Sequence, residues 1–116
     1  MKRPLVALRI ATDPMMRAKI LNGAKKISIR EGHRDYQAGD TLMICCHLEV
    51  WCVEVKVTEV RHCTVSELSR EECREDGFAD AQDALVRLRN YYPSLAKGSP
   101  VTVIHWDGVN GRLTEI

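Results

Sequence analysis

The sequence lacks any long apolar run, which bears on the class of protein. No stretch approaches the about 20 consecutive apolar residues that a membrane-spanning helix needs, so we expect no membrane partner. The apolar stretch after the basic start Met1-Lys2-Arg3-Pro4 is short and is interrupted by Arg9. We therefore also expect no signal peptide.

The sequence also lacks a dominant charge of either sign. Lys and Arg total 17 and Asp and Glu total 16, which leaves a formal net charge of +1 at pH 7. A charge this close to zero gives no overall field that attracts nucleic acid, so any basic site must be local. Apolar residues make up 45% and charged residues 28% of the 116 residues, so we expect a globular chain with one small core.

No Cys-x-x-Cys pair occurs, and the number of cysteines is odd: Cys45, Cys46, Cys52, Cys63 and Cys73. Most of them lie in strand-like apolar sequence, so we expect reduced, half-buried thiols in a cytoplasmic protein. A zinc site would have to draw on Cys45, Cys46, His47, Cys52, His62 and Cys63. Neighbouring residues on a strand point to opposite faces, so Cys45 and Cys46 cannot easily share a metal, and we expect none.

Hydrophobic periodicity predicts elements in the order β-α-β-β-β-α-α-β, with an edge strand after the turn signal Asn110-Gly111. We expect strands at residues 6–10, 26–30, 41–47, 51–63, 101–106 and 112–116, and helices between Pro14 and Gly23, Ser69 and Gly77, and Asp80 and Pro93. Consecutive strands with few helical crossovers favour an α+β fold. The predicted form is a small mixed or antiparallel β-barrel flanked by helices.

The stretch from Gly23 to Arg30 holds the first candidate chemistry. Gly23 is suited to end a helix, and Ile27 and Ile29 then alternate with Ser28 and Arg30 as on a half-buried strand. A serine is a useful nucleophile only when a base takes its proton, and a neutral lysine can do so. Lys25 could reach Ser28 only from a turn that precedes the strand. A basic strand can equally hold phosphate, and the residues alone leave both interpretations open.

The segment from Glu31 to Asp40 is predicted to be a loop, because Gly32 and the Ala38-Gly39-Asp40 turn interrupt the periodicity. It carries Arg34 and Tyr36. Such a loop is either a solvated connection or the rim of a pocket, since loops at strand ends commonly carry binding groups.

Several segments, taken in order, resemble the ASCH domain family of the PUA-like superfamily. The first half of the likeness lies in Leu21–Arg30 and Gly39-Asp40. The second half lies in the strand Val53–Val60, Val65-x-x-Leu68, Asp76-Gly77-Phe78, the helix up to Tyr92-Pro93 and the strand Val101–His105. The resemblance implies a single ASCH, PUA-like domain over residues 1–116.

Within that family, the chain is most similar in size and layout to the compact bacterial enzymes that hydrolyse N(4)-acetylcytidine. This resemblance implies that Lys25 is the base and that Ser28 is the nucleophile, in place of a threonine. It implies that Arg30 assists them, and that no metal or organic cofactor is needed. The proton-donating glutamate of these enzymes falls on Asp76 when counted without a gap from Leu68, and the neighbouring Glu75 has the matching side chain.

The same superfamily also implies a second function, RNA binding with or without ribonuclease activity. Lys25, Lys26, Arg30 and Arg34 would then contact phosphate, and Tyr36 or Trp106 would stack on a base. A third alternative is a small interaction domain, because a fold does not determine a function.

Overall fold

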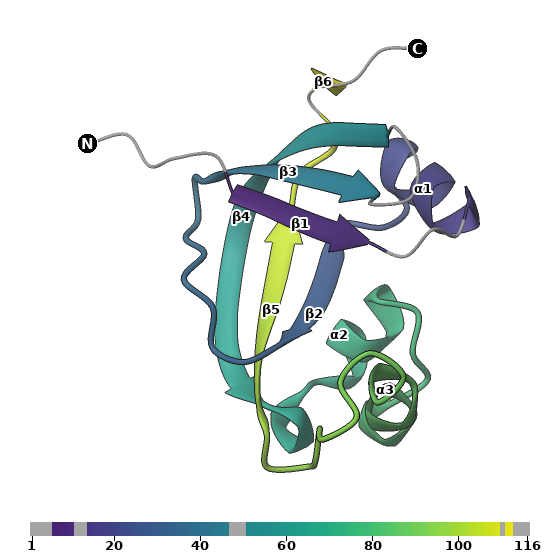
Figure 1. The fold of residues 1–116 in the computed structure, drawn as a ribbon, viewed down its shortest axis with the longest axis vertical. Coiled ribbons are helices and arrows are strands. Elements are labelled where there is room, and N and C mark those ends of the chain that lie inside the picture. Colours follow the sequence, from purple (N-terminus) through teal and green to yellow (C-terminus); the bar gives the residue numbers. More distant parts are fainter. Residues whose placement is uncertain (1–5, 11–13, 47–50, 110, 113–116) are drawn as a thin grey trace. The chain divides into compact units, whose positions relative to one another are not determined.

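The computed structural model describes residues 6–10, 14–46, 51–109 and 111–112 of the chain. The elements follow the predicted order (Figure 1): β1 (Val6–Ile10), α1 (Pro14–Leu21), β2 (Ile27–Glu31), β3 (Thr41–Cys46), β4 (Trp51–Thr64), the 3₁₀ helix η1 (Val65–Glu67), α2 (Arg70–Glu75), α3 (Ala81–Leu88), β5 (Pro100–Trp106) and β6 (Gly111–Arg112). Within these ranges, no helix is long and apolar enough to cross a membrane.

The strands pair in the order β1-β3-β4-β5-β2, and β6 pairs with β4. β1 runs parallel to β3, with Val6 opposite Leu42, whereas β3 runs antiparallel to β4, with Thr41 opposite Lys56. The sheet is therefore mixed, and together with its helices it confirms the predicted α+β class. The edge strand predicted at residues 112–116 lies mostly outside the described residues.

Contacts within the chain group it into two compact units. The first comprises the described residues of Met1–Lys26, Tyr36–Glu59 and His105–Ile116, and the second comprises Ile27–Asp35 and Val60–Ile104. β4 and β5 each contribute residues to both units. That residues 1–116 act as one domain stays a prediction.

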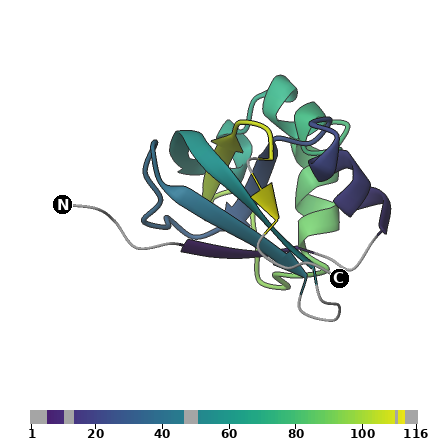
Figure 2. The same ribbon diagram turned by 90° about the horizontal axis from the view of Figure 1, so that it is seen from above.

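In the first unit, the alternation predicted for β4 is confirmed. Val53, Val55 and Val57 are buried, whereas Lys56 and Thr58 between and beyond them are exposed. The strand therefore has one apolar and one polar face, as its period-two sequence requires. Figures 1 and 2 show β1 alongside β3, the parallel pair of this unit.

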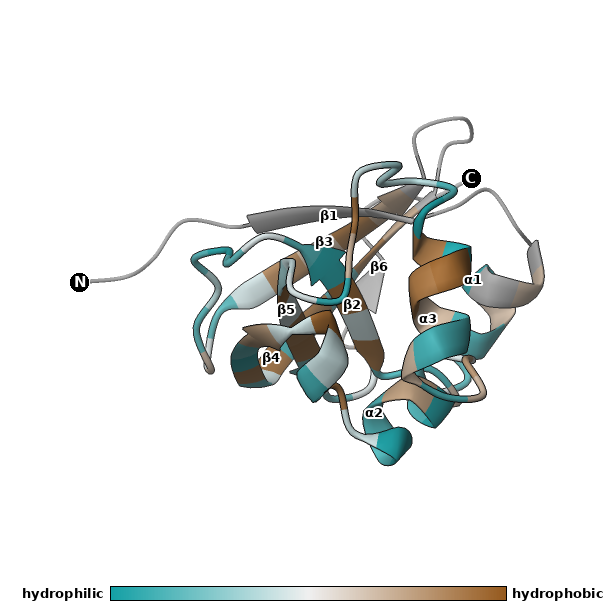
Figure 3. Ribbon diagram, turned by 90° about the horizontal axis from the view of Figure 1, so that it is seen from below, coloured by the Kyte–Doolittle hydropathy of each residue, from teal (hydrophilic) through white to brown (hydrophobic). Residues whose placement is uncertain are grey.

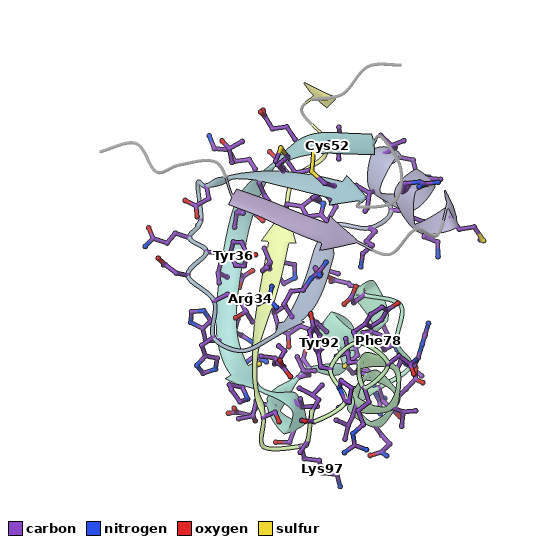
Figure 4. The ribbon with its side chains drawn as sticks, viewed as in Figure 1. Arg34, Tyr36, Cys52, Phe78, Tyr92 and Lys97 are labelled. Atoms are coloured by element: carbon purple, nitrogen blue, oxygen red, sulfur yellow. A yellow bond between two sulfur atoms is a disulfide. The ribbon has the colours of Figure 1, made fainter. Side chains whose placement is uncertain are left out.

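The prediction of reduced thiols is wrong for Cys45 and Cys52, which form a disulfide between β3 and β4 (Figure 4). The antiparallel register places these two residues directly opposite each other, with their Cα atoms 4.2 Å apart. A strand pattern cannot reveal this register, because it depends on the connection between the strands. Cys63 and Cys73 are free and buried.

The second unit is built around one apolar core that joins β2, β4, β5, α2 and α3. Its buried members are Ile27, Ile29, Cys63, Val65, Leu68, Cys73, Ala84, Leu85, Leu88, Leu95, Val101 and Val103. α3 contributes three of them at helical spacing, and Figure 3 shows that this helix carries both hydrophilic and hydrophobic residues.

α3 ends at Leu88, earlier than the predicted end near Pro93. The next residues form tighter turns, in which the Asn90 N–H donates to the Arg87 carbonyl and the Tyr91 N–H to the Leu88 carbonyl. Pro93 disfavours helical backbone in the residue before it, so the last helical turn unwinds ahead of it.

An ion pair fixes the start of α2 to β4. Arg61 donates from Nε to Glu72 Oε2 at 2.9 Å and from a terminal nitrogen to Glu72 Oε1 at 2.8 Å. Glu72 also accepts the Ser69 N–H, and Ser69 Oγ accepts the Glu72 N–H, which is the capping box that the spacing predicts. The hydrogen bonds from Arg61 hold the pKa of the Glu72 carboxyl below its usual value.

We expect Glu72→Gln to lower the free energy of unfolding by about 1–2 kcal/mol at pH 7, since one charge-assisted bond and part of the cap are lost. A carboxyl whose pKa is depressed in the folded state stabilises the fold above its unfolded pKa of about 4.3. That stability is lost as pH falls through the folded pKa, so the difference between the two proteins should shrink below about pH 4. Urea denaturation at several pH values measures it.

Glu71→Gln is the matched control, because Glu71 is an exposed neighbour in the same helical turn. An equal loss of stability in both variants would contradict the role assigned to the Arg61–Glu72 pair.

Candidate functional site

Strand β2 presents two different faces, and the candidate chemistry lies on one of them. Ile27 and Ile29 belong to the apolar core of the second unit. Successive side chains of a strand point to opposite sides, so Ser28 and Arg30 share the other face. Ser28 is only 5% exposed, whereas Arg30 is half-buried. The strand thus presents a buried hydroxyl beside a guanidinium that solvent reaches.

The Ser28 hydroxyl and the Arg30 guanidinium are joined directly. Arg30 Nε donates to Ser28 Oγ at 2.7 Å. Because the oxygen accepts this bond, the hydroxyl proton remains available to a base. A positively charged donor also stabilises any negative charge that develops on the oxygen. The terminal nitrogens of Arg30 make no hydrogen bond among the described residues, so they can bind a ligand.

Asp76 approaches the same strand from the end of α2. Its Oδ2 accepts the Ile29 N–H at 3.1 Å. Asp76 is the C-cap residue, and Gly77 follows it with a φ of 91°. The Gly77 N–H donates to Arg74 O and the Phe78 N–H to Cys73 O, the paired bonds of a Schellman motif. A defined helix end therefore sets the position of this carboxylate.

The pairing of β2 explains why Ile29 is available to Asp76. β2 lies at one end of the strand order and pairs with β5, where the Gly32 N–H donates to Pro100 O. Backbone groups along an antiparallel strand face its partner at alternate residues. By that alternation the backbone groups of Ser28 and Arg30 face β5, whereas the backbone groups of Ile29 face the open edge of the sheet. The Ile29 N–H therefore needs an acceptor other than a strand.

Glu75, the alternative acid, is the last residue of α2 and is exposed, whereas Asp76 is half-buried. The hydrogen bond from the Ile29 N–H shows that Asp76 lies against β2, and which of the two acids is the proton donor stays a prediction. The matching side chain of Glu75 was the only signal in its favour.

The loop after β2 is held in place by Thr102, a residue that the sequence did not single out. Thr102 is fully buried on β5, and its Oγ1 donates to Gly32 O at 2.6 Å and accepts the Arg34 N–H at 2.8 Å. Arg34 Nε donates to Glu31 O at 2.9 Å, and its terminal nitrogens are without a hydrogen bond among the described residues. Figure 4 shows Arg34 beside β5.

Two histidines tie the same loop to β4. His62 Nε2 lies 2.8 Å from Arg34 O, and His33 Nε2 lies 3.2 Å from Cys63 O. A carbonyl only accepts, so each Nε2 carries a proton, and the two rings pack with their centroids 4.9 Å apart. The loop segment that carries Arg34 is therefore anchored from two strands.

Lys25 and Tyr36 belong to the first unit. Lys25 is 7% exposed and lies in the turn that follows Gly23, where its N–H donates to Lys19 O at 3.0 Å. β2 begins at Ile27, so Lys25 precedes the regular strand, and its role as the base for Ser28 stays a prediction. Tyr36 is only 8% exposed, which disagrees with a solvated side chain. Its place on the rim of a pocket stays a prediction.

The free cysteines are poor alternatives to Ser28 as a nucleophile. Burial raises the pKa of the Cys63 thiol and of the Cys73 thiol, which keeps both protonated at neutral pH. Only a thiolate attacks efficiently. No group of three or more His, Cys, Asp or Glu side chains in the described ranges is arranged to hold a metal ion.

We expect Thr102→Val to lower the free energy of unfolding by about 1–3 kcal/mol, because it leaves the buried Gly32 carbonyl and Arg34 N–H without their partner. Urea denaturation measures this loss. Thr58→Val makes the same chemical change at an exposed position and should cost little. If Thr102→Val is as stable as Thr58→Val, Thr102 does not hold the loop.

Comparison with known proteins shows a likeness in structure but not in sequence. No protein-family model matches the chain, and no curated protein matches it. The ASCH domain of Lactobacillus crispatus superposes with a TM-score of 0.69 at 16% identity, over 93% of this chain and 80% of that one. The ASCH protein of Zymomonas mobilis gives a TM-score of 0.59 at 14% identity, over 90% of this chain and 68% of that one.

A third solved structure, a protein from Enterococcus faecalis V583, superposes with a TM-score of 0.63 at 11% identity, over 88% of this chain and 74% of that one. Identities this low leave the chemistry of the site open and establish the backbone arrangement alone. This chain has the α+β, PUA-like fold of the ASCH domains.

Proposed function

We propose that the protein is an amidohydrolase that removes the acetyl group from N(4)-acetylcytidine or a related modified nucleoside. The observation that carries the proposal is the bond from Arg30 Nε to the buried Ser28 Oγ, with the Asp76 carboxylate on the next peptide of the same strand. The ASCH fold supports it, since the resemblance assigns a hydroxyl nucleophile and an acid to these positions.

In the proposed reaction, Ser28 Oγ attacks the acetyl carbonyl carbon while a base takes its proton, the role that the resemblance assigns to Lys25. The carbonyl oxygen becomes an oxyanion, which the terminal nitrogens of Arg30 can stabilise. Breaking the C–N bond transfers the acetyl group to Ser28. Asp76, in its protonated form, gives its proton to the departing amino group of cytidine and is left as a carboxylate, with Glu75 as the alternative donor.

Water then completes the reaction. It attacks the serine ester and gives one proton to the ionised acid, which restores the proton donor. The C–O bond to Ser28 then breaks, the serine oxygen takes back its proton from the base, and acetic acid leaves and ionises to acetate. The burial of Ser28 favours this order of events, because bulk water has little access until the nucleoside has left. Atoms and charges balance without a cofactor.

We expect the protein to convert N(4)-acetylcytidine to cytidine, detected by mass spectrometry, and Ser28→Ala to lose at least about 10³-fold in kcat because the nucleophile is gone. Ser28→Thr keeps the hydroxyl and should retain activity. Full turnover by Ser28→Ala would exclude the mechanism, and no turnover by the unaltered protein would exclude the substrate.

Lys25→Met should lower kcat by about 10²–10⁴-fold if Lys25 is the base. Lys26→Met is the matched control, since Lys26 is its exposed neighbour whereas Lys25 is buried. Equal effects of the two substitutions would indicate a general loss of positive charge rather than loss of a base.

A second candidate function, RNA binding, is favoured by the terminal nitrogens of Arg30 and Arg34, which have no hydrogen-bond partner among the described residues. The two terminal nitrogens of each guanidinium can donate to two oxygens of one phosphate group. If RNA is the ligand, affinity for a single-stranded oligonucleotide should fall steeply with salt, and Arg34→Gln should reduce the slope of log K against log salt by about 0.7. Fluorescence anisotropy at several salt concentrations measures it, and salt-independent binding would contradict it.

A further inference from the structure

The turn that follows α2 connects Asp76 to the first turn of α3. Residues 76–80 form this turn and belong to no helix or strand. The position of the Asp76 carboxylate therefore depends on the conformation of this turn. The Schellman bonds of Gly77 and Phe78 hold the turn on the side of α2.

From the side of α3, Arg87 makes two contacts with this turn. Its terminal nitrogen donates to the Gly77 carbonyl at 2.9 Å, and its guanidinium carbon lies 5.1 Å from the centroid of the Phe78 ring. Figure 4 shows Phe78 beside α3, and Phe78 packs on the apolar core of the unit. The guanidinium thus spans the backbone and the side chain of the two residues directly after Asp76.

Asp83 orients Arg87 and holds the turn as well. Its Oδ2 lies 3.7 Å from the Arg87 terminal nitrogen and accepts the Ala79 N–H at 2.9 Å. Asp83 and Arg87 are four residues apart on one helix face, the spacing at which an acid and a base pair. The N-cap Asp80 in turn accepts the Asp83 N–H at 2.8 Å.

Gly77 makes the turn dependent on these contacts. Its φ of 91° is in the left-handed region. Because glycine has no Cβ, the peptides on either side of it rotate more easily than those next to any other residue. The Gly77 carbonyl is the group that Arg87 binds. Without that bond, the peptide after Gly77 is held only by the hydrogen bond from the Phe78 N–H to the Cys73 carbonyl, and the position of the Asp76 side chain loses one of its supports.

We infer that Arg87 is a positioning residue for the Asp76 carboxylate, acting through the Gly77 carbonyl and the Phe78 ring. The inference rests on the proposed function for its catalytic consequence, but its structural content is independent of it. Arg87 binds the turn rather than Ser28 or Arg30, so its effect on the reaction is indirect. Displacing a catalytic group by even a fraction of its hydrogen-bond length weakens proton transfer.

The direct test measures amide hydrogen exchange at Ile29, because this N–H donates to Asp76 Oδ2. Arg87→Met keeps an apolar side chain of similar length over Phe78 but removes the donor to Gly77. We expect Ile29 to exchange at least about tenfold faster in this variant once differences in global stability are subtracted. Arg87→Lys keeps a charged donor and should recover part of the protection.

Arg89→Met is the matched control. Arg89 lies at the same end of α3 and also donates from its guanidinium to a backbone carbonyl, but that carbonyl belongs to Leu95, at 2.7 Å, and not to the turn at residues 76–80. Ile29 exchange should be unchanged by this substitution. If Arg87→Met accelerates Ile29 no more than Arg89→Met does, the inference is overturned.

The kinetic test uses N(4)-acetylcytidine and the same three variants. Arg87→Met should lower kcat about threefold to tenfold with KM unchanged, because the binding face of β2 is intact and only the acid is displaced. A change in KM alone, or an equal loss of kcat in Arg89→Met, would contradict the positioning role.

The two hypotheses fail in different ways. If the unaltered protein does not turn over the nucleoside, the proposed function is wrong, and the exchange of Ile29 still decides whether Arg87 positions Asp76. If turnover is normal but neither the exchange of Ile29 nor kcat responds to Arg87→Met, the inference about Arg87 is wrong and the proposed function stands.

Discussion

The hydrogen bond from the Ile29 N–H to the Asp76 carboxylate is the constraint on which the candidate chemistry depends. It arises because β2 lies at one end of the strand order, where alternate backbone groups have no neighbouring strand to bind. A carboxylate that accepts a hydrogen bond from such a backbone N–H is held beside the strand, because the N–H needs an acceptor. The same requirement brings an acid next to the peptide that follows Ser28.

One short strand serves the core and the candidate site at the same time. Ile27 and Ile29 are buried in the apolar core, and Ser28 and Arg30 occupy the opposite face, where they bind each other. Because side chains alternate, shifting the register of β2 by one residue would bury the polar pair in the core and expose the isoleucines. The packing of the core therefore fixes the direction in which the hydroxyl points.

The ASCH fold is shared with the Lactobacillus and Zymomonas domains at 16% and 14% identity. At that distance a backbone arrangement survives while nearly every side chain can differ, so activity has to be argued from individual groups. Two groups depart from the resemblance: Ser28 keeps the hydroxyl of the expected threonine, and Asp76 keeps the carboxyl of the expected glutamate on a shorter side chain. The Arg30 donor on that hydroxyl supplies a physical reason for reactivity that holds for either residue.

The sequence by itself determined the order of the elements, the apolar faces of β2 and β4 and the capping box at Ser69 and Glu72, because periodicity and capping are local properties. It also led to Ser28, Arg30 and Asp76, through the resemblance to a family.

Only the tertiary structure decided which residues meet. The Cys45–Cys52 pairing depends on the register of two strands, and the burial of Thr102 against the loop at Arg34 depends on which strand lies beside β2. The contact of Asp76 with the Ile29 N–H depends on the direction in which one helix end faces an open strand edge. Such contacts join residues up to 70 positions apart, and no local pattern carries information about partners so distant.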